Sequence, residues 1–213
     1  MLAGISHDLR TPLTRMRLTA EMLPDEFLRE GLVYDIEDMD AILEQFISFM
    51  KDGSDEAVRL TNLKPIINEI VVQFAPLPFV IDIAEDLPSV PLRPLSIKRL
   101  IVNLVNNASR YGKPPIHIGI HIETSKDNGA DVLVLPKYLM IAVSDEGEGV
   151  AEDQLERIMQ PFERGETART TQGSGLGLAI VSRITHLQNG TGRARNQGTQ
   201  GGLEGLIKIP IID

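Results

Sequence analysis

Apolar residues near the start of the chain recur at helical spacing. The first set falls at steps of three and four, on one face of a helix, and comprises Ile5, Leu9, Leu13, Met16, Ala20 and Leu23. After a break at Pro24 and Asp25, a second set has the spacing of a heptad seam and comprises Leu32, Ile36, Met39, Leu43, Phe46 and Met50. The pattern predicts two helices joined as a hairpin.

A hairpin of two such helices cannot bury both apolar stripes by itself. The economical arrangement is a dimeric four-helix bundle, in which two copies cover each other's stripes. Charge and glycine at 51–61 end the heptad spacing, which marks a domain boundary. We therefore expect a helical hairpin at residues 1–52, a linker at 53–61 and a second domain at 62–213.

The rest of the chain mixes helical and extended patterns. Helical spacing recurs at 63–74, 95–108 and 175–187, and strand patterns occur at 79–84, 116–122, 132–135, 139–143 and 206–212. Helices and strands mixed in this way predict a sandwich of one sheet backed by helices. The expected fold class is therefore α+β, with a helical hairpin followed by an α/β sandwich domain.

Composition narrows the classes of function. The net charge of −9 and the lack of a Lys/Arg cluster argue against a nucleic-acid surface. Without cysteine there is no disulfide framework, zinc-thiolate site or thiol nucleophile, which fits the cytosol. No apolar run is long enough for a membrane span. Because residues 1–5 already follow the apolar spacing without a capping residue, we expect the first helix to begin upstream of this fragment.

His7 stands beside Asp8 in the sequence Ser-His-Asp-Leu-Arg-Thr-Pro-Leu. The stripe residues are Ile5 and Leu9, so His7 points away from the apolar side of its helix. A neutral imidazole nitrogen is a nucleophile toward phosphorus, and a neighbouring carboxylate can orient the ring and accept its proton. An exposed histidine on a helix is usually incidental, so this pair gains meaning only from the other motifs.

Asn103 and Asn107 are four residues apart and share one face of the helix predicted at 95–108. Asparagine is an unfavourable choice inside a helix, and its carbonyl oxygen can bind Mg²⁺, which prefers oxygen ligands. The alternative is a polar helix face with no ligand. The two residues alone leave both interpretations open.

Two glycine motifs follow. Asp145-Glu-Gly147-Glu-Gly149 places an acidic acceptor at the end of a predicted strand, in a turn whose glycines let a ligand approach closely. Gly173-Ser-Gly175-Leu-Gly177 leads into a predicted helix, whose N-terminus favours phosphate. The second motif is neither a Walker loop nor a Rossmann fingerprint, because no lysine follows it and no βαβ unit precedes it. Each motif alone is weak evidence for a nucleotide site.

In this order the motifs resemble the H, N, G1, F and G2 boxes of sensor histidine kinases, with Pro-Phe-Glu-Arg at 161–164 as the F box. The resemblance covers nearly the whole chain and is closest to the EnvZ type of osmosensor, in the sequences at 6–15, 94–99 and 110–112. It implies a dimerisation and phosphotransfer domain, then an ATP-binding domain of the Bergerat (GHKL) fold with a mobile lid. It also implies a homodimer, an OmpR-type response regulator as partner, and attachment to the bacterial inner membrane only through segments outside this chain, which would lie in the cytoplasm.

The resemblance further implies a role for each matching residue. His7 would accept the phosphoryl group of ATP, Asp8 would activate it, and Thr11 would position water when the partner is dephosphorylated. Asn107 would bind Mg²⁺, and Asp145 would accept a hydrogen bond from the adenine amino group. The other nucleotide-binding residues would be Asn103, Ala108, Ser109, Arg110, Tyr111, Gly147, Gly149, Arg164, Gly165, Gly173, Ser174, Gly175, Leu176, Gly177 and Leu178.

Three features depart from this pattern. The segment 123–137 is longer than expected for the EnvZ type, and Glu146 and Glu148 add negative charge to the G1 box. His117 and His121 share a strand face and could bind a metal, although no third ligand is evident.

Two rival functions stay open. A GHKL ATPase of the chaperone or mismatch-repair kind shares the nucleotide motifs, but the hairpin with His7 argues against it. A non-catalytic dimeric adaptor for a receiver domain is the other, and the intact Asn107, Asp145 and glycine motifs argue against that. The sequence does not indicate the stimulus, the cognate receiver or whether phosphorylation occurs in cis or in trans.

Overall fold

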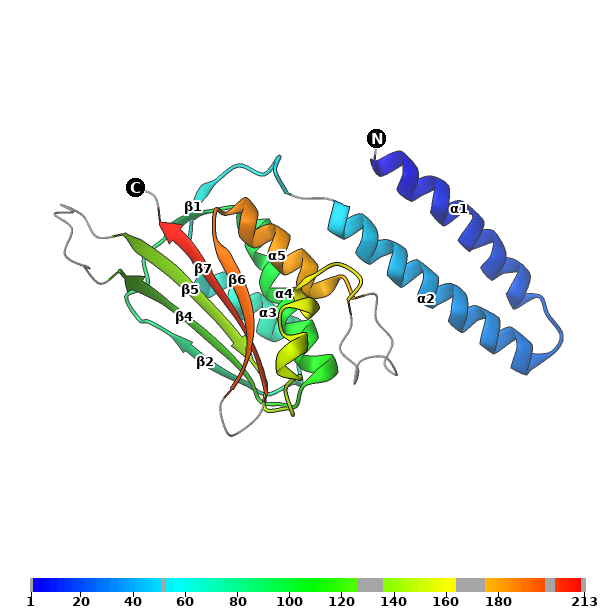
Figure 1. Cartoon of the computed structure of the whole chain (residues 1–213). Coiled ribbons are helices and arrows are strands. Elements are labelled where there is room, and N and C mark those ends of the chain that lie inside the picture. Colours follow the sequence, from blue (N-terminus) through cyan, green and yellow to red (C-terminus); the bar gives the residue numbers. More distant parts are fainter. Residues whose placement is uncertain (1, 51–52, 126–135, 164–174, 198–201, 212–213) are drawn as a thin grey trace.

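A computed structural model describes residues 2–50, 53–125, 136–163, 175–197 and 202–211. Two antiparallel helices form the N-terminal part, α1 (Leu2–Glu21) and α2 (Glu26–Met50). Figure 1 shows this hairpin beside a separate body of sheet and helices, with α1 on the outer side of α2. Ion pairs join the two helices, from Arg17 to Glu37 at 3.1 Å and from Arg10 to Asp40 at 3.8 Å. The predicted hairpin is confirmed.

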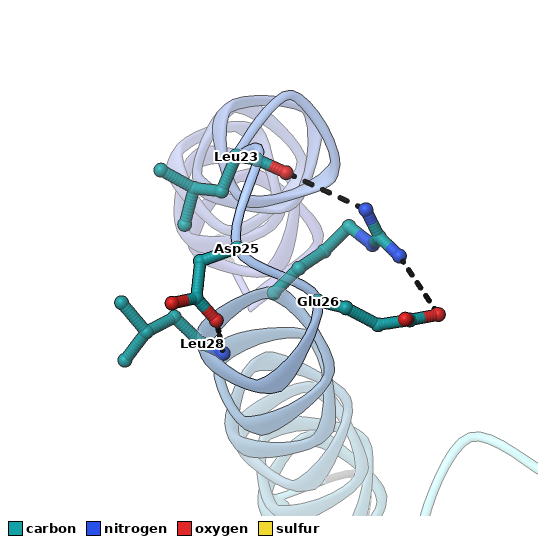
Figure 2. Close-up of polar contacts among 5 residues, drawn as sticks. Leu23, Asp25, Glu26 and Leu28 are labelled. Carbon is teal, nitrogen blue, oxygen red and sulfur yellow. Dashed lines mark hydrogen bonds and ion pairs between the residues drawn. The ribbon is translucent and has the colours of Figure 1, made fainter.

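The turn between the helices is closed by local polar contacts (Figure 2). The Asp25 Oδ1 atom accepts a hydrogen bond from the backbone N–H of Leu28 at 3.1 Å, which caps the start of α2. The Arg29 guanidinium donates to the carbonyl of Leu23 at 3.4 Å and to Glu26 at 3.5 Å. These contacts tie the end of α1 to the first turn of α2.

The hairpin leaves most of its large apolar side chains exposed. Ala20 and Ile36 are buried. The exposed apolar residues of the hairpin are Leu9, Met16, Leu18, Met22, Phe27, Leu28, Leu32, Tyr34, Met39, Ile42 and Phe46. Among the described residues, no helix combines the length and hydropathy that crossing a membrane requires.

The second body is a five-stranded sheet with helices on one face (Figure 1). Its strands, in spatial order, are β2 (Phe79–Ile83), β4 (Ile116–Thr124), β5 (Lys137–Ser144), β7 (Leu203–Ile211) and β6 (Thr191–Asn196). Strands β2 and β4 are parallel and the other neighbours are antiparallel. The covering helices are α3 (Leu63–Gln73), α4 (Pro94–Tyr111) and α5 (Gly177–Leu187). The α+β fold class is therefore confirmed.

The core lies between the sheet and the helices. The alternation predicted for 116–122 is confirmed, because Ile116, Ile118 and Ile120 are buried while the residues between them are more exposed. The face of α4 that meets them contains Ile97, Leu100, Ile101, Leu104 and Val105, all buried. This packing fixes the end of β5 and the last turns of α4 in space, and both carry predicted site residues.

Smaller elements complete the second body. Strand β1 (Arg59–Thr61) pairs with β3 (Val90–Leu92), and two short 3₁₀ turns, η1 (Glu152–Gln154) and η2 (Arg157–Met159), follow β5. Neither β1, β3 nor β6 was expected from the sequence pattern. The strand expected at 132–135 lies outside the described residues.

The segment expected to be a linker makes specific contacts. The Glu56 carboxylate accepts hydrogen bonds from the backbone N–H groups of Leu95 at 2.6 Å and Ser96 at 2.9 Å, which caps the start of α4. The Arg93 guanidinium donates to the carbonyl of Glu56 at 2.9 Å and to that of Leu187 at 3.1 Å. Residues 53–61 therefore pack on α4 and α5, and the limits 1–52, 53–61 and 62–213 stay a prediction.

Candidate nucleotide-binding site

Asp145 follows the last residue of β5 and is 3% exposed. Its Oδ1 atom accepts hydrogen bonds from the backbone N–H of Gly147 at 2.8 Å and of Leu203 at 3.5 Å, and the backbone N–H of Lys113 also bonds to this carboxyl. The Asp145 backbone N–H in turn donates to the carbonyl of Leu203 at 3.3 Å. Three segments far apart in the sequence therefore meet at one carboxyl group.

Burial is the main influence on the Asp145 carboxyl, and it raises the pKa above the ordinary value. The three backbone N–H groups favour the charged form and oppose that rise. An ionised carboxylate has about four lone-pair positions, so three N–H donors leave capacity for one more donor. The geometry fits an acceptor for a ligand amino group.

Three glycines surround Asp145, and each approaches it closely. A Cβ atom added at Gly112 would lie 2.1 Å from the Asp145 Cγ, and one added at Gly147 would lie 2.8 Å from its Oδ1. Gly202 has a φ of +86°, and an added Cβ would overlap the Asp145 carbonyl. Ordinary contacts of a Cβ begin at 3.4 Å, so these positions require glycine. Only Gly147 was expected in the site from the sequence.

The two extra carboxylates of the G1 motif each contact a nitrogen of a nearby side chain. Glu146 pairs with the His117 ring at 3.1 Å, and Glu148 pairs with Lys113 at 3.5 Å. Each added negative charge therefore has a cationic or titratable neighbour on the segment that follows α4. No group of three or more His, Cys, Asp or Glu side chains among the described residues is arranged to hold a metal, and His117 faces Glu146.

The predicted asparagines lie on one face of α4. Asn103 donates from its side-chain Nδ2 to the carbonyl of Arg99 at 2.8 Å, which leaves its oxygen toward α5, where a Cβ added at Gly177 would lie 3.7 Å away. Asn107 is half-buried, and its side chain makes no hydrogen bond to any residue the structure describes. An amide oxygen in this position fits the oxygen ligands that Mg²⁺ prefers.

The end of α4 carries the other predicted residues of this motif. Ala108 is buried, Ser109 and Arg110 are exposed, and the Tyr111 side chain is 41% exposed. They precede Gly112, which packs on Asp145. The last turn of α4 and the G1 turn are therefore brought together, as the sequence predicts for a shared nucleotide site.

The G2 motif is described from Gly175 onward. Gly175 has a φ of +70°, and its carbonyl accepts a hydrogen bond from the backbone N–H of Phe162 at 3.1 Å, so the F and G2 motifs touch. Helix α5 begins at Gly177, after the N-cap residue Leu176, whose own side chain makes no capping hydrogen bond. Leu176 and Leu178 are buried and anchor this end. The expected residues Arg164, Gly165, Gly173 and Ser174 lie outside the described residues.

The motif around His7 lies on the other body. His7 and Asp8 are in α1, but their side chains lie outside the described part of the structure. Thr11 is exposed one turn further along the helix. Helix α1 packs on α2, and α2 contacts α5 near its end, where the Arg183 guanidinium lies 5.2 Å from the centre of the Phe49 ring. His7 and Asp145 thus belong to different bodies joined through α2.

Several contacts of the site were not expected from the sequence. They involve Gly112, Gly202 and Leu203 at Asp145, and Asn196 at the end of β6. The glycine pair at 201–202 is a signal that could have indicated a close approach. Nothing in the local pattern marks Asn196, because the residues around it are polar and alternate weakly.

Comparisons with sequence families give two matches. Residues 93–210 match the model of the family described as histidine kinase-, DNA gyrase B-, and HSP90-like ATPase. Residues 1–62 match the model described as the His Kinase A (phospho-acceptor) domain. The two matches cover both bodies of the fold.

Curated relatives and solved structures agree with these families. The chain is 32% identical over its whole length to the sensor histidine kinase GtrS of Pseudomonas aeruginosa, of which it covers 42%. It is 27% identical over 99% of its length to CpxA of Escherichia coli, of which it covers 46%. The chain therefore spans less than half the length of these relatives.

Two solved structures are similar to this chain. A crystal structure of full-length ShkA with AMPPNP matches 99% of the chain and 45% of its own length, with a TM-score of 0.71 and 20% identity, which shows the fold. The histidine kinase domain of the E. coli osmosensor EnvZ matches 72% of this chain and 88% of its own length, with a TM-score of 0.51 and 31% identity.

Proposed function

Because this chain belongs to the sensor histidine kinases, we propose that it phosphorylates itself on His7 from ATP and passes the phosphoryl group to an aspartate of a response regulator. The observation that carries the proposal is the buried Asp145 carboxyl, enclosed by Gly112, Gly147 and Gly202, in a chain whose first 62 residues match the His Kinase A (phospho-acceptor) family. An acceptor of this kind suits the amino group of adenine.

In the proposed reaction, a neutral nitrogen of His7 attacks the γ-phosphorus of ATP. An N–P bond forms, the bond between the γ-phosphorus and the bridging oxygen breaks, and ADP leaves. Asp8 orients the ring and accepts its proton. Asn107 would hold Mg²⁺, which supplies charge neutralisation at the phosphate oxygens when bound. The N-terminus of α5 and the glycines before it support phosphate binding.

We assign the remaining predicted residues to the same site. Asn103 and Gly177, which face each other across α4 and α5, would line the phosphates, and Arg110 and Tyr111 would flank the nucleotide. Gly173 to Leu178 and Arg164 with Gly165 would form the lid. The second body, residues 62–213, would carry the nucleotide, and residues 1–52 would carry His7.

The exposed apolar stripe of the hairpin supports a homodimer. A helical pair that exposes this many Leu, Met, Ile and Phe side chains needs a partner surface, and a second hairpin offers a matching one. Sedimentation of the purified chain should give twice the monomer mass. The assembly would then present His7 on the outside of a four-helix bundle.

The motif around His7 supports two further proposals, the type of response regulator that is the partner and the dephosphorylation of that regulator. The likeness of 6–15 to the EnvZ type supports an OmpR-type response regulator as the phosphoryl acceptor. Exposed Thr11, one turn after His7, would position water for dephosphorylation of that regulator. We place this part of the protein in the cytoplasm, where ATP and response regulators occur, and the longer protein in the inner membrane.

The test is incubation of the chain with γ-labelled ATP and Mg²⁺, scoring acid-labile, base-stable label on the protein. His7→Gln and Asn107→Ala should both lose the label. His121→Gln is the matched control, because His121 is exposed on β4 and has no part in the proposed site. Phosphate released to solution without label on the protein, unchanged in His7→Gln, would favour the ATPase instead.

A further inference from the structure

Asn196 is the last residue of β6 and lies opposite Leu203 on β7. Its Oδ1 atom accepts a hydrogen bond from the backbone N–H of Val150 at 3.0 Å, and its Nδ2 atom donates to the carbonyl of Val150 at 2.7 Å. Nδ2 also donates to the Glu152 carboxylate at 3.1 Å. A backbone N–H only donates and a carbonyl only accepts, so these partners fix the orientation of the amide.

Gly149 allows the Asn196 side chain to lie against the backbone of the turn. It has a φ of +73°, and a Cβ added there would lie 2.5 Å from the Asn196 Oδ1 atom and 3.4 Å from the Gly202 carbonyl oxygen. The family resemblance implies that Gly149 binds the nucleotide. In the structure its absent side chain makes room for Asn196.

The turn from Asp145 to Val150 is therefore held at both ends by the β6–β7 hairpin. Asp145 is held at the first end by its backbone and carboxyl bonds to Leu203. Val150 is held at the second end by Asn196. Between them Gly147 is buried, and the exposed side chains of Glu146 and Glu148 reach only His117 and Lys113, so the hairpin supplies the contacts at the two ends of the turn.

We propose that Asn196 is a positioning residue for the nucleotide, which sets the affinity for adenine and the selectivity against guanine by holding Gly149 and Val150 against β6. The inference rests on the proposed function and extends it to a residue that the motifs do not contain. Asn196 acts through the turn. Without it, the Gly149–Val150 end of the turn loses its hydrogen bonds to β6, and Gly147 is held only by its own hydrogen bond to Asp145, so the base meets a less preformed acceptor.

The experiment measures the Kd of the full chain for ADP and for GDP by calorimetry, with the thermal midpoint of the nucleotide-free protein. Asn196→Ala should raise the Kd for ADP about tenfold, since two backbone hydrogen bonds are lost, and should narrow the ratio between the two nucleotides. The labelling rate at saturating ATP should stay within about twofold, because the reacting groups are untouched.

Asn196→Asp is a second variant that keeps the test valid if Asn196→Ala does not fold. It keeps the shape and the bond from the Val150 N–H, but places an oxygen against the Val150 carbonyl and a charge beside Glu152, so its Kd for ADP should also rise. Arg193→Ala is the matched control, because Arg193 is exposed on the same strand, and its Kd should equal that of the parent.

Two results overturn the inference in distinguishable ways. If the parent binds ADP and both Asn196 variants bind it equally well, with only the thermal midpoint lowered, Asn196 has a purely structural role. If the parent binds no ADP, the proposed function fails and this inference fails with it.

Discussion

Replacement of Gly112 by alanine tests whether the Asp145 carboxyl is held by steric fit. The added Cβ would lie 2.1 Å from the Asp145 Cγ and 2.5 Å from its Cβ, about 1.3 Å and 0.9 Å short of the 3.4 Å at which ordinary contact begins. The backbone of Gly112 is extended, with a φ of −99°, so alanine causes no strain in the main chain itself. The whole effect must come from the collision.

Asp145 cannot move away without breaking its hydrogen bonds to Gly147 and Leu203. Overpacking of a buried site costs about 1–3 kcal/mol, so we expect the free energy of unfolding of Gly112→Ala to fall by about 2 kcal/mol. The Kd for ADP should rise more than tenfold, because a hydrogen bond to a charged group contributes about 1.5–3 kcal/mol. Urea denaturation and calorimetry measure the two effects.

The chain contains a matched control on a neighbouring strand. Gly119 lies on β4, and the nearest atom to an added Cβ is the Ala142 Cβ at 3.9 Å, so Gly119→Ala should change stability by less than about 0.5 kcal/mol. Combining Gly112→Ala with Asp145→Gly removes the colliding side chain, so the double variant should be about as stable as Asp145→Gly alone. If Gly112→Ala behaves like Gly119→Ala, the steric account is refuted.

Three further predictions concern the same body. Glu56→Ala removes the cap of α4 and should lower the free energy of unfolding by about 1–2 kcal/mol in urea denaturation, whereas Ala at the exposed Asp86 should have almost no effect. Burial raises the pKa of Asp145, so this carboxyl stabilises the folded chain fully below its ordinary pKa of about 3.9 and loses that contribution as pH rises through the raised value. The free energy of unfolding of the nucleotide-free parent, minus that of Asp145→Asn, should therefore decrease as pH rises from the ordinary pKa through the raised pKa. A difference that does not change with pH contradicts this prediction. An alanine side chain at Gly177 fits beside Asn103, so Gly177→Ala should stabilise α5 by no more than about 1 kcal/mol. The same variant should weaken ATP binding if the phosphates lie against the backbone of Gly177. An ATP affinity that calorimetry finds unchanged argues against the lid role.

The sequence pattern predicted the elements whose apolar residues recur with the period of a helix or a strand. The two hairpin helices, α4 and β4 each have a regular apolar face, and the core of the second body forms along the faces of α4 and β4. Strand β6 has the sequence Thr-Gly-Arg-Ala-Arg-Asn, whose inward positions are glycine, alanine and asparagine, so it lacks an apolar signal. It is a strand because β7 pairs with it, which is a tertiary effect.

The residues of the candidate site likewise include some that the sequence predicted and some that it did not. Asp145, Gly147 and the α4 asparagines stand in recognisable motifs, and the structure brings the Asp145 turn to the end of α4. Gly112, Leu203 and Asn196 act through long-range contacts that no local pattern contains. Glu56 was assigned to a linker because charge and glycine surround it, whereas its carboxylate is committed to the backbone of α4.

The place of the β6–β7 hairpin at the Asp145 carboxyl has a consequence for synthesis of the protein. Leu203 follows Asp145 by 58 residues, so a ribosome working at roughly 5–20 residues per second completes the partner of this carboxyl several seconds later. Until then the turn lacks Leu203, and for most of that interval it lacks Asn196 as well. A nascent chain that ends before β7 therefore has an incomplete pocket at Asp145, and we expect ATP to stabilise the chain only after β7 has been made.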